Sequence, residues 1–337
     1  MNYKLSVIIP IYNADQYLKR CIDSVIKQSI GFENIELILV DDNSTDDSKK
    51  IIKEYCDKYN NIRGIFLNEN HGTPSFGRNK GIEISSTEYI MFLDSDDEFD
   101  CEICEKLYDV IRSNEVDLVQ CNHIHKDDVN VVYRKIPDNE KENDIFYDED
   151  IINHISLSIW DKIFKKSIII ENSIFFKEKI LSEDNLFIVE YCLNSNKLIK
   201  LNGYHGYIYY GSHLSSYSIN FILNIINVCH IVHRLSKKHN VQSDIFYYFG
   251  QNINIAIGSL ILISDISLKD IYLIIKKLYE LEIEINFNNS YLNVPFIRFI
   301  NNLIITNHFS IAKYVIYFLN RLANKSIFRA IYRKKYS

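Results

Sequence analysis

Short runs of branched apolar residues alternate with helix-spaced segments along the first third of the chain. The runs cover residues 5–9, 37–40, 62–67 and 89–93, and each has the length of a strand buried on both faces. Between them, apolar positions repeat at helical spacing. Strands separated by helices usually pair in parallel through right-handed crossovers. The pattern therefore predicts an α/β fold with a doubly wound sheet, which binds ligands beyond the carboxyl ends of its strands.

Polar residues predict where two of these helices begin. Asn13, followed three residues later by Gln16, has the spacing of a capping box. Ser44 precedes the second helix-spaced segment, with Asp46 and Asp47 in its expected first turn. We therefore expect Asn13 and Ser44 to act as helix caps.

The pattern changes after about residue 116. Residues 118–125 and 129–133 read as strands, and residues 134–150 are polar and acidic and read as a loop. From about residue 220 onward the apolar spacing is helical almost throughout. A mixed α/β region followed by a helical region is therefore expected.

Overall charge and cysteine usage narrow the class of protein. The 337 residues carry 38 basic and 44 acidic side chains, a net charge of -6, which argues against a nucleic-acid binder. Seven scattered cysteines indicate reduced thiols, and Cys101 with Cys104 forms only half of a zinc site.

The apolar run after Lys4 ends at Pro10 without a cleavage site, and no apolar run reaches spanning length. We expect a cytoplasmic protein.

Carboxylates cluster directly after two of the predicted strands. The second strand is followed by Asp41 and Asp42, and the fourth by Asp94, Asp96 and Asp97. Acidic side chains crowded at buried strand ends need a compensating positive charge. A hard divalent cation, Mg²⁺ or Mn²⁺, would supply it and leave positions open for phosphate. The alternative is a pair of solvated acidic turns that cap helices.

Four linked motifs resemble one known family. They are Leu5-Ser6-Val7-Ile8-Ile9-Pro10-Ile11-Tyr12-Asn13, Val40-Asp41-Asp42-Asn43-Ser44-Thr45-Asp46, Gly77-Arg78-Asn79-Lys80-Gly81 and Phe92-Leu93-Asp94-Ser95-Asp96-Asp97. In order and spacing the chain resembles family 2 glycosyltransferases with the GT-A fold over about residues 4–100. The resemblance extends more weakly through residues 160–164 and 182–184. With these segments included, the chain is similar to bacterial and archaeal enzymes that build surface glycans.

The resemblance implies a GT-A domain with a mixed, Rossmann-like sheet flanked by helices over residues 1–219. It implies a donor half over about residues 1–116 and an acceptor half over about 117–219. The family's reaction is inverting transfer of a sugar from a nucleotide diphosphate to an acceptor hydroxyl. Beyond residue 220 the chain resembles nothing that we recognise, so residues 220–337 are expected only to be a helical C-terminal region.

The first two motifs would hold the nucleoside of the donor. By resemblance, Pro10, Tyr12 and Asn13 follow the first strand where such enzymes bind base and ribose, and Tyr12 could stack on uracil. Asp42 resembles the carboxylate that accepts a hydrogen bond from the uracil ring N–H, with Asp41 as the alternate. A UDP-linked donor is therefore the family expectation, and Tyr12 as ordinary loop packing is the alternative.

The fourth motif resembles the D-x-D sequence that binds metal and ribose in this family. Asp96 would ligate Mn²⁺ or Mg²⁺, Asp94 with Ser95 would hold the ribose or a metal-bound water, and Asp97 could assist the metal. His213 follows a tyrosine-rich run and is the candidate for the histidine that some GT-A enzymes place near the metal. Its alternative is a structural role.

The remaining candidates would bind phosphate and acceptor and move the proton. Arg78 lies in a glycine-flanked segment and could clamp phosphate with its planar fork. Asp184, with Glu183 as alternate, resembles the family's E-D pair, whose aspartate takes the acceptor proton. Plain helix N-terminal charge is the other interpretation. Trp160 and Lys162 are expected to shape the acceptor side, where Trp160 could stack on a sugar ring or pack in the core.

The end of the chain is basic. Basic side chains recur every fourth residue at Arg321, Lys325, Arg329 and Arg333, and Lys334 and Lys335 follow without any acidic residue. Such an amphipathic end could lie on an anionic membrane surface, which would suit a lipid-linked acceptor. A solvated face, or docking against the acidic body of the chain, is the alternative.

Two other functions remain open on sequence grounds. A nucleotidyltransferase also combines a doubly wound sheet with aspartate-bound Mg²⁺, but it usually has a glycine-rich basic loop where this chain has residues 10–13. A non-catalytic nucleotide-sugar-binding assembly subunit would keep the fold without the reaction. The donor sugar, the acceptor glycan or lipid-linked acceptor, and the linkage are not readable from these motifs.

Overall fold

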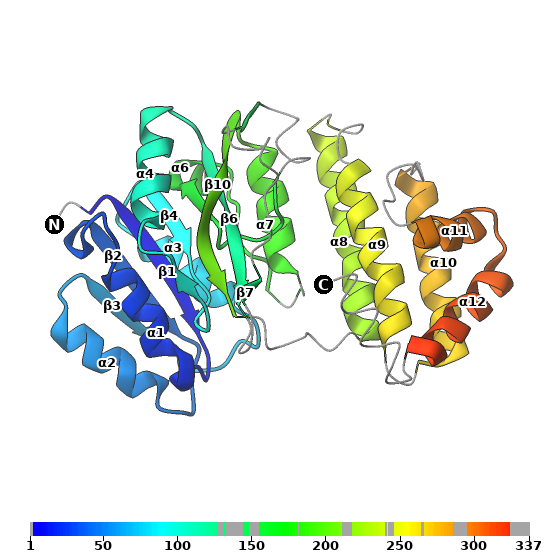
Figure 1. Ribbon diagram of the computed structural model, residues 1–337, viewed down its shortest axis with the longest axis horizontal. Coiled ribbons are helices and arrows are strands. Elements are labelled where there is room, and N and C mark those ends of the chain that lie inside the picture. Colours follow the sequence, from blue (N-terminus) through cyan, green and yellow to red (C-terminus); the bar gives the residue numbers. More distant parts are fainter. Residues whose placement is uncertain are drawn as a thin grey trace. The chain divides into compact units, whose positions relative to one another are not determined.

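The computed structural model divides the chain into two compact units, Met1–His213 and Leu214–Ser337. It describes residues 3–126, 131–132, 144–147, 155–178, 180, 182–210, 218–239, 241, 246–263, 266–285 and 295–323. The first unit is a sheet flanked by helices, and the second is helical wherever it is described as regular structure (Figure 1). This is the expected order of an α/β region followed by a helical region.

The first unit is built on one ten-stranded sheet with the order β3-β2-β1-β4-β9-β6-β10-β5. Its main strands are β1 (Leu5–Ile11), β2 (Ile35–Asp41), β3 (Ile62–Phe66), β4 (Tyr89–Phe92), β6 (Leu118–Lys126), β9 (Lys162–Lys165) and β10 (Lys197–Tyr209). Three short strands complete it: β5 (Glu98–Phe99), β7 (Val131–Val132) against β6, and β8 (Asp144–Tyr147) against β10. The four sequence-predicted strands of the first third are confirmed as β1 to β4.

Strand direction explains why one edge of the sheet carries the polar motifs. Strands β1, β2, β3 and β4 are parallel to one another. β9 is antiparallel to both of its neighbours, β4 and β6, so β6 runs in the direction of β4, and β10 is parallel to β6. The carboxyl ends of β1, β2, β4, β6 and β10 therefore meet at the same edge as the amino end of β9.

Helices cover both faces of this sheet. α1 (Asp15–Ile26), α2 (Ser48–Lys58) and α4 (Ile103–Ser113) share one apolar core with alternate residues of the strands, and Figure 1 shows α1 and α2 over that face. α3 (Ser75–Ile84) and α7 (Glu183–Cys192) pack on the opposite face, where Phe187 meets Phe92 edge-on at 5.9 Å. The 3₁₀ turn η1 (Phe32–Asn34) and α6 (Lys166–Glu171) are short connectors.

Glycine allows α3 to lie directly on β1. A Cβ atom added at Gly81 would stand 2.3 Å from the Ile8 side chain, and one at Gly77 would stand 3.3 Å from Pro10. Only a residue without a side chain permits the approach at Gly81. The glycines of this motif therefore set how deeply α3, and the side chains that it carries, are seated against the sheet.

Two expected helix caps are wrong. α1 begins at Asp15 after Ala14, and α2 begins at Ser48 after Asp47, with no side-chain cap at either start. Asn13 instead adopts a left-handed backbone with φ 47°, and its Oδ1 accepts a hydrogen bond from the Thr45 N–H at 2.8 Å. The Asn13 N–H donates to Ser44 Oγ at 3.0 Å. These residues therefore join two loops to each other instead of capping helices.

The region after residue 126 differs from its expected form in one place. Of the predicted strand 129–133, Val131–Val132 form β7, and its other residues lie outside the described part of the chain. Within the expected loop 134–150, Asp144–Tyr147 form β8 and pair antiparallel with β10. The loop expectation is therefore wrong for those four residues. The rest of that segment also lies outside the described residues.

The second unit consists of α8 (Ile219–Lys238), α9 (Phe246–Leu262), α10 (Leu268–Ile285), α11 (Pro295–Ile305) and α12 (Phe309–Ala323). Its core is mostly aliphatic, with Tyr248 and Phe249 also buried, and it includes Glu282, to which the Asn301 amide donates at 3.2 Å. α8 is long and apolar enough to cross a membrane by length and composition, and 44% of its apolar window is buried. All seven cysteines of the chain are free thiols.

Candidate active site

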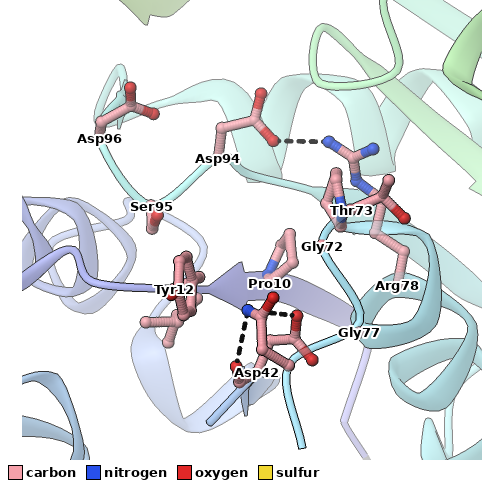
Figure 2. A pocket seen from close by; sticks show the side chains of 13 residues that line it. Pro10, Tyr12, Asp42, Gly72, Thr73, Gly77, Arg78, Asp94, Ser95 and Asp96 are labelled. Carbon is pink, nitrogen blue, oxygen red and sulfur yellow. Dashed lines mark hydrogen bonds and ion pairs between the residues drawn. The ribbon is translucent and has the colours of Figure 1, made fainter. Parts of the chain in front are cut away.

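A pocket of about 330 Å³ lies at the edge of the sheet where β1, β2 and β4 end (Figure 2). Seven of the sequence-predicted residues line it: Pro10, Tyr12, Asp42, Arg78, Asp94, Ser95 and Asp96. The loop between β3 and α3 contributes Asn70, Gly72, Thr73 and Pro74. The structure therefore brings together all four motifs, whose pocket-lining residues are up to 86 positions apart in the sequence.

At one end of the pocket, Asp42 faces an exposed aromatic ring. Tyr12 is 50% exposed, so its ring is not held by core packing. The Asp42 carboxylate accepts hydrogen bonds from the Asn70 amide at 3.1 Å and from the His71 N–H at 2.9 Å. The His71 ring nitrogen Nδ1 lies 2.7 Å from the other carboxylate oxygen. This end offers a ligand one flat surface and one acidic acceptor.

Asn13 and Asp41 do not line the pocket but build the loops that do. The Asp41 side chain is fully buried and accepts a hydrogen bond from the Ser44 N–H at 3.1 Å. Asn13 joins the loop after β1 to the loop after β2 through Ser44 and Thr45. Two non-glycine residues, Asn13 and Asn43, hold left-handed backbones there. Such conformations persist where surrounding contacts determine them, as these cross-loop hydrogen bonds do.

Away from Tyr12 and Asp42, Arg78 bridges two acidic motifs. Its guanidinium donates to Asp94 Oδ1 at 2.8 Å, drawn in Figure 2, and to Glu183 Oε1 at 2.7 Å. The Arg78 side chain is only 6% exposed. Burial alone would lower its pKa, but the nearby carboxylates of Asp94, Glu183 and Asp184 outweigh burial and raise it. Arg78 is therefore a permanent cation that ties the end of β4 to the start of α7.

Asp184 lies next to this ion pair at the first turn of α7. Burial and the Glu183 carboxylate raise its pKa from 3.8 to about 6, although the Arg78 charge acts in the opposite direction. The Asn185 N–H donates to Asp184 Oδ1 at 2.9 Å. A carboxylate with a pKa near 6 is mostly ionised at neutral pH and is a better proton acceptor than an ordinary aspartate.

Residues of α3 also anchor the segment that leads to α7. Asn79 pairs with the backbone of Phe176 through two hydrogen bonds of 2.9 Å, and Ser75 Oγ donates to the Lys177 carbonyl at 3.1 Å. The Phe176 ring in turn stacks on Phe187 with 4.1 Å between ring centroids. α3 therefore fixes the approach to the acidic pair through Ser75 and Asn79 as well as through Arg78.

Asp97 does not share the pocket with Asp94 and Asp96. It is 1% exposed, and its two oxygens accept hydrogen bonds from the Tyr207 hydroxyl at 2.6 Å and the Tyr210 N–H at 2.8 Å. Burial, together with Asp94 and Asp96, raises its pKa to about 7 even though both hydrogen bonds act to lower it. Asp97, expected from the sequence to assist the metal, thus fastens the acidic loop, residues 94–97, to the end of β10.

The sequence of the chain matches a known protein family. The family model described as glycosyl transferase family 2 matches residues 6–174, which is half of the chain. The chain belongs to glycosyl transferase family 2. The matched span of this family 2 chain includes both acidic loops and the whole of α3, and it ends before Glu183 and Asp184.

Relatives of this family 2 chain include proteins named for teichoic acid and for poly(ribitol-phosphate). The minor teichoic acid biosynthesis protein GgaB of Bacillus subtilis is 46% identical over 121 residues, which are 35% of this chain and 13% of that protein. The poly(ribitol-phosphate) β-N-acetylglucosaminyltransferase TarP of Staphylococcus aureus is 36% identical over 178 residues, 51% of this chain and 52% of TarP. The chain spans only 13% to 42% of the length of the first three curated relatives.

A solved structure shares the fold over almost the whole chain. S. aureus TarS residues 1–349, in complex with UDP-GlcNAc, superimposes with a TM-score of 0.73 at 21% identity. The superposition covers 93% of this chain and 90% of that one. The GT-A-like mixed sheet and the helical C-terminal region expected from the sequence are therefore confirmed.

The expected acceptor-side residues of the family 2 chain have different surroundings. Trp160 lies just before β9, at the same sheet edge as the pocket, and stacks on Tyr207 at 4.1 Å and Tyr209 at 6.1 Å. Lys162 is fully buried and bonded to Asp161, Ser156 and Ser158. The buried Lys162 ammonium group fixes the turn before β9, so any part that it plays in shaping the acceptor side acts through that turn. Trp160 is only partly buried, and His123 packs edge-on against it at 4.9 Å.

Three residues of the family 2 site escaped the sequence analysis, namely Asn70, His71 and Asn79. Asn70 and His71 lie in the loop between β3 and α3, and Gly72 and Pro74, which follow them there, are the sequence signal that could have marked it. Asn79 lies inside a motif that was recognised for its arginine. His213, the candidate near the metal, lies outside the described residues.

Proposed function

We propose that this chain is an inverting glycosyltransferase that moves a sugar from a UDP-linked donor to an acceptor hydroxyl in cell-surface polysaccharide or glycoconjugate synthesis. The observation that carries the proposal is one pocket in which a nucleoside end, with Tyr12 and Asp42, and a phosphate end, with Arg78 and Asp94, lie beside a raised-pKa carboxylate, Asp184. Family membership supports the reaction class.

The donor would lie along the pocket from the end of β1 to the end of β4. Tyr12 would stack on the uracil ring and Asp42 would accept its ring N–H, while Pro10 supports the base and Ser95 and Asp94 reach the ribose. Arg78 would donate to a phosphate oxygen. Its Nε atom is buried and has no hydrogen-bond partner among the described residues, so this donor is available inside the site.

The acidic loop fits a divalent cation. Asp94 and Asp96 both line the pocket, and two carboxylates combined with diphosphate oxygens are the ligands that Mg²⁺ and Mn²⁺ take in proteins. Among the described residues no cluster of three acidic, histidine or cysteine side chains forms a protein-only site. The diphosphate would therefore complete the coordination. When bound, the metal would act as a Lewis acid that stabilises negative charge on the diphosphate.

Asp184 would act as the general base. The acceptor oxygen forms a bond to the anomeric carbon while the bond from that carbon to the diphosphate oxygen breaks, so the configuration inverts in one displacement. The hydroxyl proton passes to the Asp184 carboxylate, and the nucleotide diphosphate leaves with the bonding electron pair. Glu183 is engaged with Arg78 at 2.7 Å and so holds the pair in place without taking the proton.

The acceptor would approach over the aromatic cluster beside the acidic loop. Trp160, Tyr209 and His123 meet at the sheet edge next to Tyr207, whose hydroxyl donates to Asp97. Ring faces of this kind bind the apolar faces of sugars. Because relatives are named for teichoic acid and poly(ribitol-phosphate) substrates, we propose a surface glycan or polyol-phosphate chain, free or lipid-linked, as the acceptor class.

Nucleotide binding tests this proposal most directly. We expect UDP and UDP-sugars to raise the melting temperature of the chain, with a larger rise in Mn²⁺ than in EDTA, because the diphosphate completes the metal coordination. Differential scanning fluorimetry over UDP-, GDP-, CDP- and dTDP-linked sugars measures this. No response to any nucleotide diphosphate, with or without metal, would contradict the proposal.

Activity assays separate the rival functions. A nucleotidyltransferase would respond to nucleoside triphosphates with a sugar phosphate and release pyrophosphate. A non-catalytic assembly subunit would bind the nucleotide sugar but would neither transfer nor hydrolyse it. Detection of UDP release that depends on an added acceptor distinguishes the transferase from both.

We also propose that the chain works in the cytoplasm at an anionic membrane surface. α12 exposes three apolar side chains at helical spacing, Ile311 (51%), Tyr314 (57%) and Phe318 (63%). The sequence beyond α12 is basic at Lys325 and Arg329, residues that lie outside the described part of the chain. Exposed apolar groups followed in the sequence by basic residues suit a membrane interface.

Liposome flotation checks the membrane proposal. Replacing Lys325, Arg329 and Arg333 by glutamine should weaken binding to vesicles rich in anionic lipid by roughly 100-fold, since each basic residue near such a surface contributes about 1 kcal/mol. Neutral phosphatidylcholine vesicles are the control and should bind both proteins weakly. Equal binding of the triple variant and the unchanged chain to anionic vesicles would refute the role of the tail.

A further inference from the structure

Asp42 is surrounded on one side by donors that come from two adjacent residues. Its Oδ2 accepts from the Asn70 amide at 3.1 Å and from the His71 backbone N–H at 2.9 Å, and its Oδ1 lies 2.7 Å from His71 Nδ1 (Figure 2 shows the Asp42 side of the pocket). An ionised carboxylate can only accept hydrogen bonds, so Nδ1 carries the proton in this contact. The imidazole therefore donates to Asp42.

The His71 ring is fixed in this orientation. It stacks on Phe76 with 3.9 Å between ring centroids and 10° between planes, and its side chain is 18% exposed. Its other nitrogen, Nε2, lies 4.0 Å from the exposed Glu69 carboxylate. His71 does not itself line the pocket, whereas Asp42 and Asn70 do. Any effect of His71 on a ligand must therefore act through Asp42.

The number of lone pairs left on Asp42 follows from these contacts. A carboxylate has about four acceptor sites, two on each oxygen. Two donors fill Oδ2 and one donor fills one site of Oδ1. One acceptor site on Oδ1 is left for a ligand in the pocket.

We propose that His71 is a positioning residue that restricts Asp42 to reading one ring N–H, and that it thereby selects uracil over guanine in the donor. This inference rests on the proposed function, since it assumes a nucleoside diphosphate in the pocket. Uracil presents one ring N–H between two carbonyl groups, which matches a single vacant acceptor site. Guanine presents two adjacent N–H groups, which pair with a carboxylate that has both oxygens available. Cytosine presents a ring lone pair there, which the carboxylate repels.

Two substitutions separate the hydrogen bond of His71 from its stacking. In His71→Phe the ring can still stack on Phe76, but the donor to Asp42 is lost. In His71→Asn the amide nitrogen can stand where Nδ1 stood, so the donor is kept while the stacking is lost. Calorimetric titration of each protein with UDP, GDP and CDP in Mn²⁺ measures the preference for the base.

We expect His71→Phe to bind UDP about tenfold more weakly and GDP no more weakly than the unchanged chain, so that the UDP-to-GDP preference narrows by about tenfold. His71→Asn should keep the preference of the unchanged chain. In steady-state assays His71→Phe should raise KM for the UDP-sugar and leave kcat nearly unchanged, because the reacting atoms are not touched.

An unchanged UDP-to-GDP preference in His71→Phe would overturn the inference. So would a pattern in which His71→Asn loses the preference and His71→Phe keeps it, because stacking and not the donor would then be responsible. If the unchanged chain binds none of UDP, GDP and CDP, the proposed function fails. If it binds UDP and only the variants behave unexpectedly, the role of His71 alone fails.

Discussion

Replacing Asp184 by asparagine is expected to lower kcat for sugar transfer by about 10²–10⁴-fold, the range that a positioned general base contributes. Kd for UDP should stay within about twofold, because Asp184 does not line the nucleotide pocket. Transfer assays at saturating donor, with calorimetric titration of UDP, measure the two quantities. Loss of UDP binding in Asp184→Asn would show that this residue holds the donor and would refute its role as base.

The raised pKa of Asp184 predicts how both the activity and the stability of the chain depend on pH. Protonation removes the lone pair that accepts the acceptor proton, so kcat/KM should fall about tenfold per pH unit below about pH 6. The folded-state pKa lies above the ordinary value of 3.8, so the ionised form is disfavoured on folding and stability is lost as pH rises through about 6. Asp184→Asn should therefore be no less stable than the unchanged chain at pH 7.5.

A matched control for that variant exists on the surface of α4. Asp109 is exposed, so Asp109→Asn removes the same charge without touching the pocket. We expect Asp109→Asn to keep kcat, Kd for UDP and the acidic limb of the pH profile. A pH profile of Asp184→Asn that still falls below pH 6 with residual activity would assign that limb to another group.

Replacing Arg78 by methionine is expected to lower both the stability of the chain and its affinity for UDP. It leaves Asp94 and Glu183 without their shared cation in a site where Arg78 is only 6% exposed. Breaking a buried ion pair from one side costs about 3–5 kcal/mol, because the remaining charges stay buried and unpaired. Arg78→Met should lower the free energy of unfolding by that amount, as measured by urea denaturation, and should weaken UDP binding by roughly 10–100-fold.

Two companion variants keep this prediction testable if Arg78→Met unfolds. Arg78→Lys retains the positive charge but not the planar fork that reaches both carboxylates, so it should recover part of the stability while donor binding stays weak. Lys80, on the same helix, pairs with Glu83 at the surface. Lys80→Met should change the stability by less than about 1 kcal/mol, as surface ion pairs do. Equal losses in Lys80→Met and Arg78→Met would contradict the bridging role.

The sequence predicted the parts of this molecule that depend on local pattern. Strands β1 to β4 were readable because buried parallel strands are continuous apolar runs. β8 (Asp144–Tyr147) and β9 (Lys162–Lys165) were not, because polar residues interrupt or flank their short apolar stretches, and they form strands through their partners β10, β4 and β6.

Within the site, residue types were readable and orientations were not. Nothing in the run Asp94-Ser95-Asp96-Asp97 shows that Asp97 turns inward, because the groups that hold it, Tyr207 and Tyr210, come more than a hundred residues later. Likewise, Asn13 and Ser44 have the residue types of helix caps, but the two loops that they occupy meet in space and use those polar groups to bind each other. Contacts between distant segments decided both outcomes.

The strand order has a consequence for how the protein can be divided. β9 comes from the second half of the first unit but lies between β4 and β6, and β5 comes from the first half but pairs with β10. A cut near residue 116 would expose one edge of β4 and leave β5 without its partner. Each half contributes strands that pair with strands of the other half, so the two halves must fold as one unit. A chimera made to change the acceptor would thus need to carry a matching β9 and β10 together.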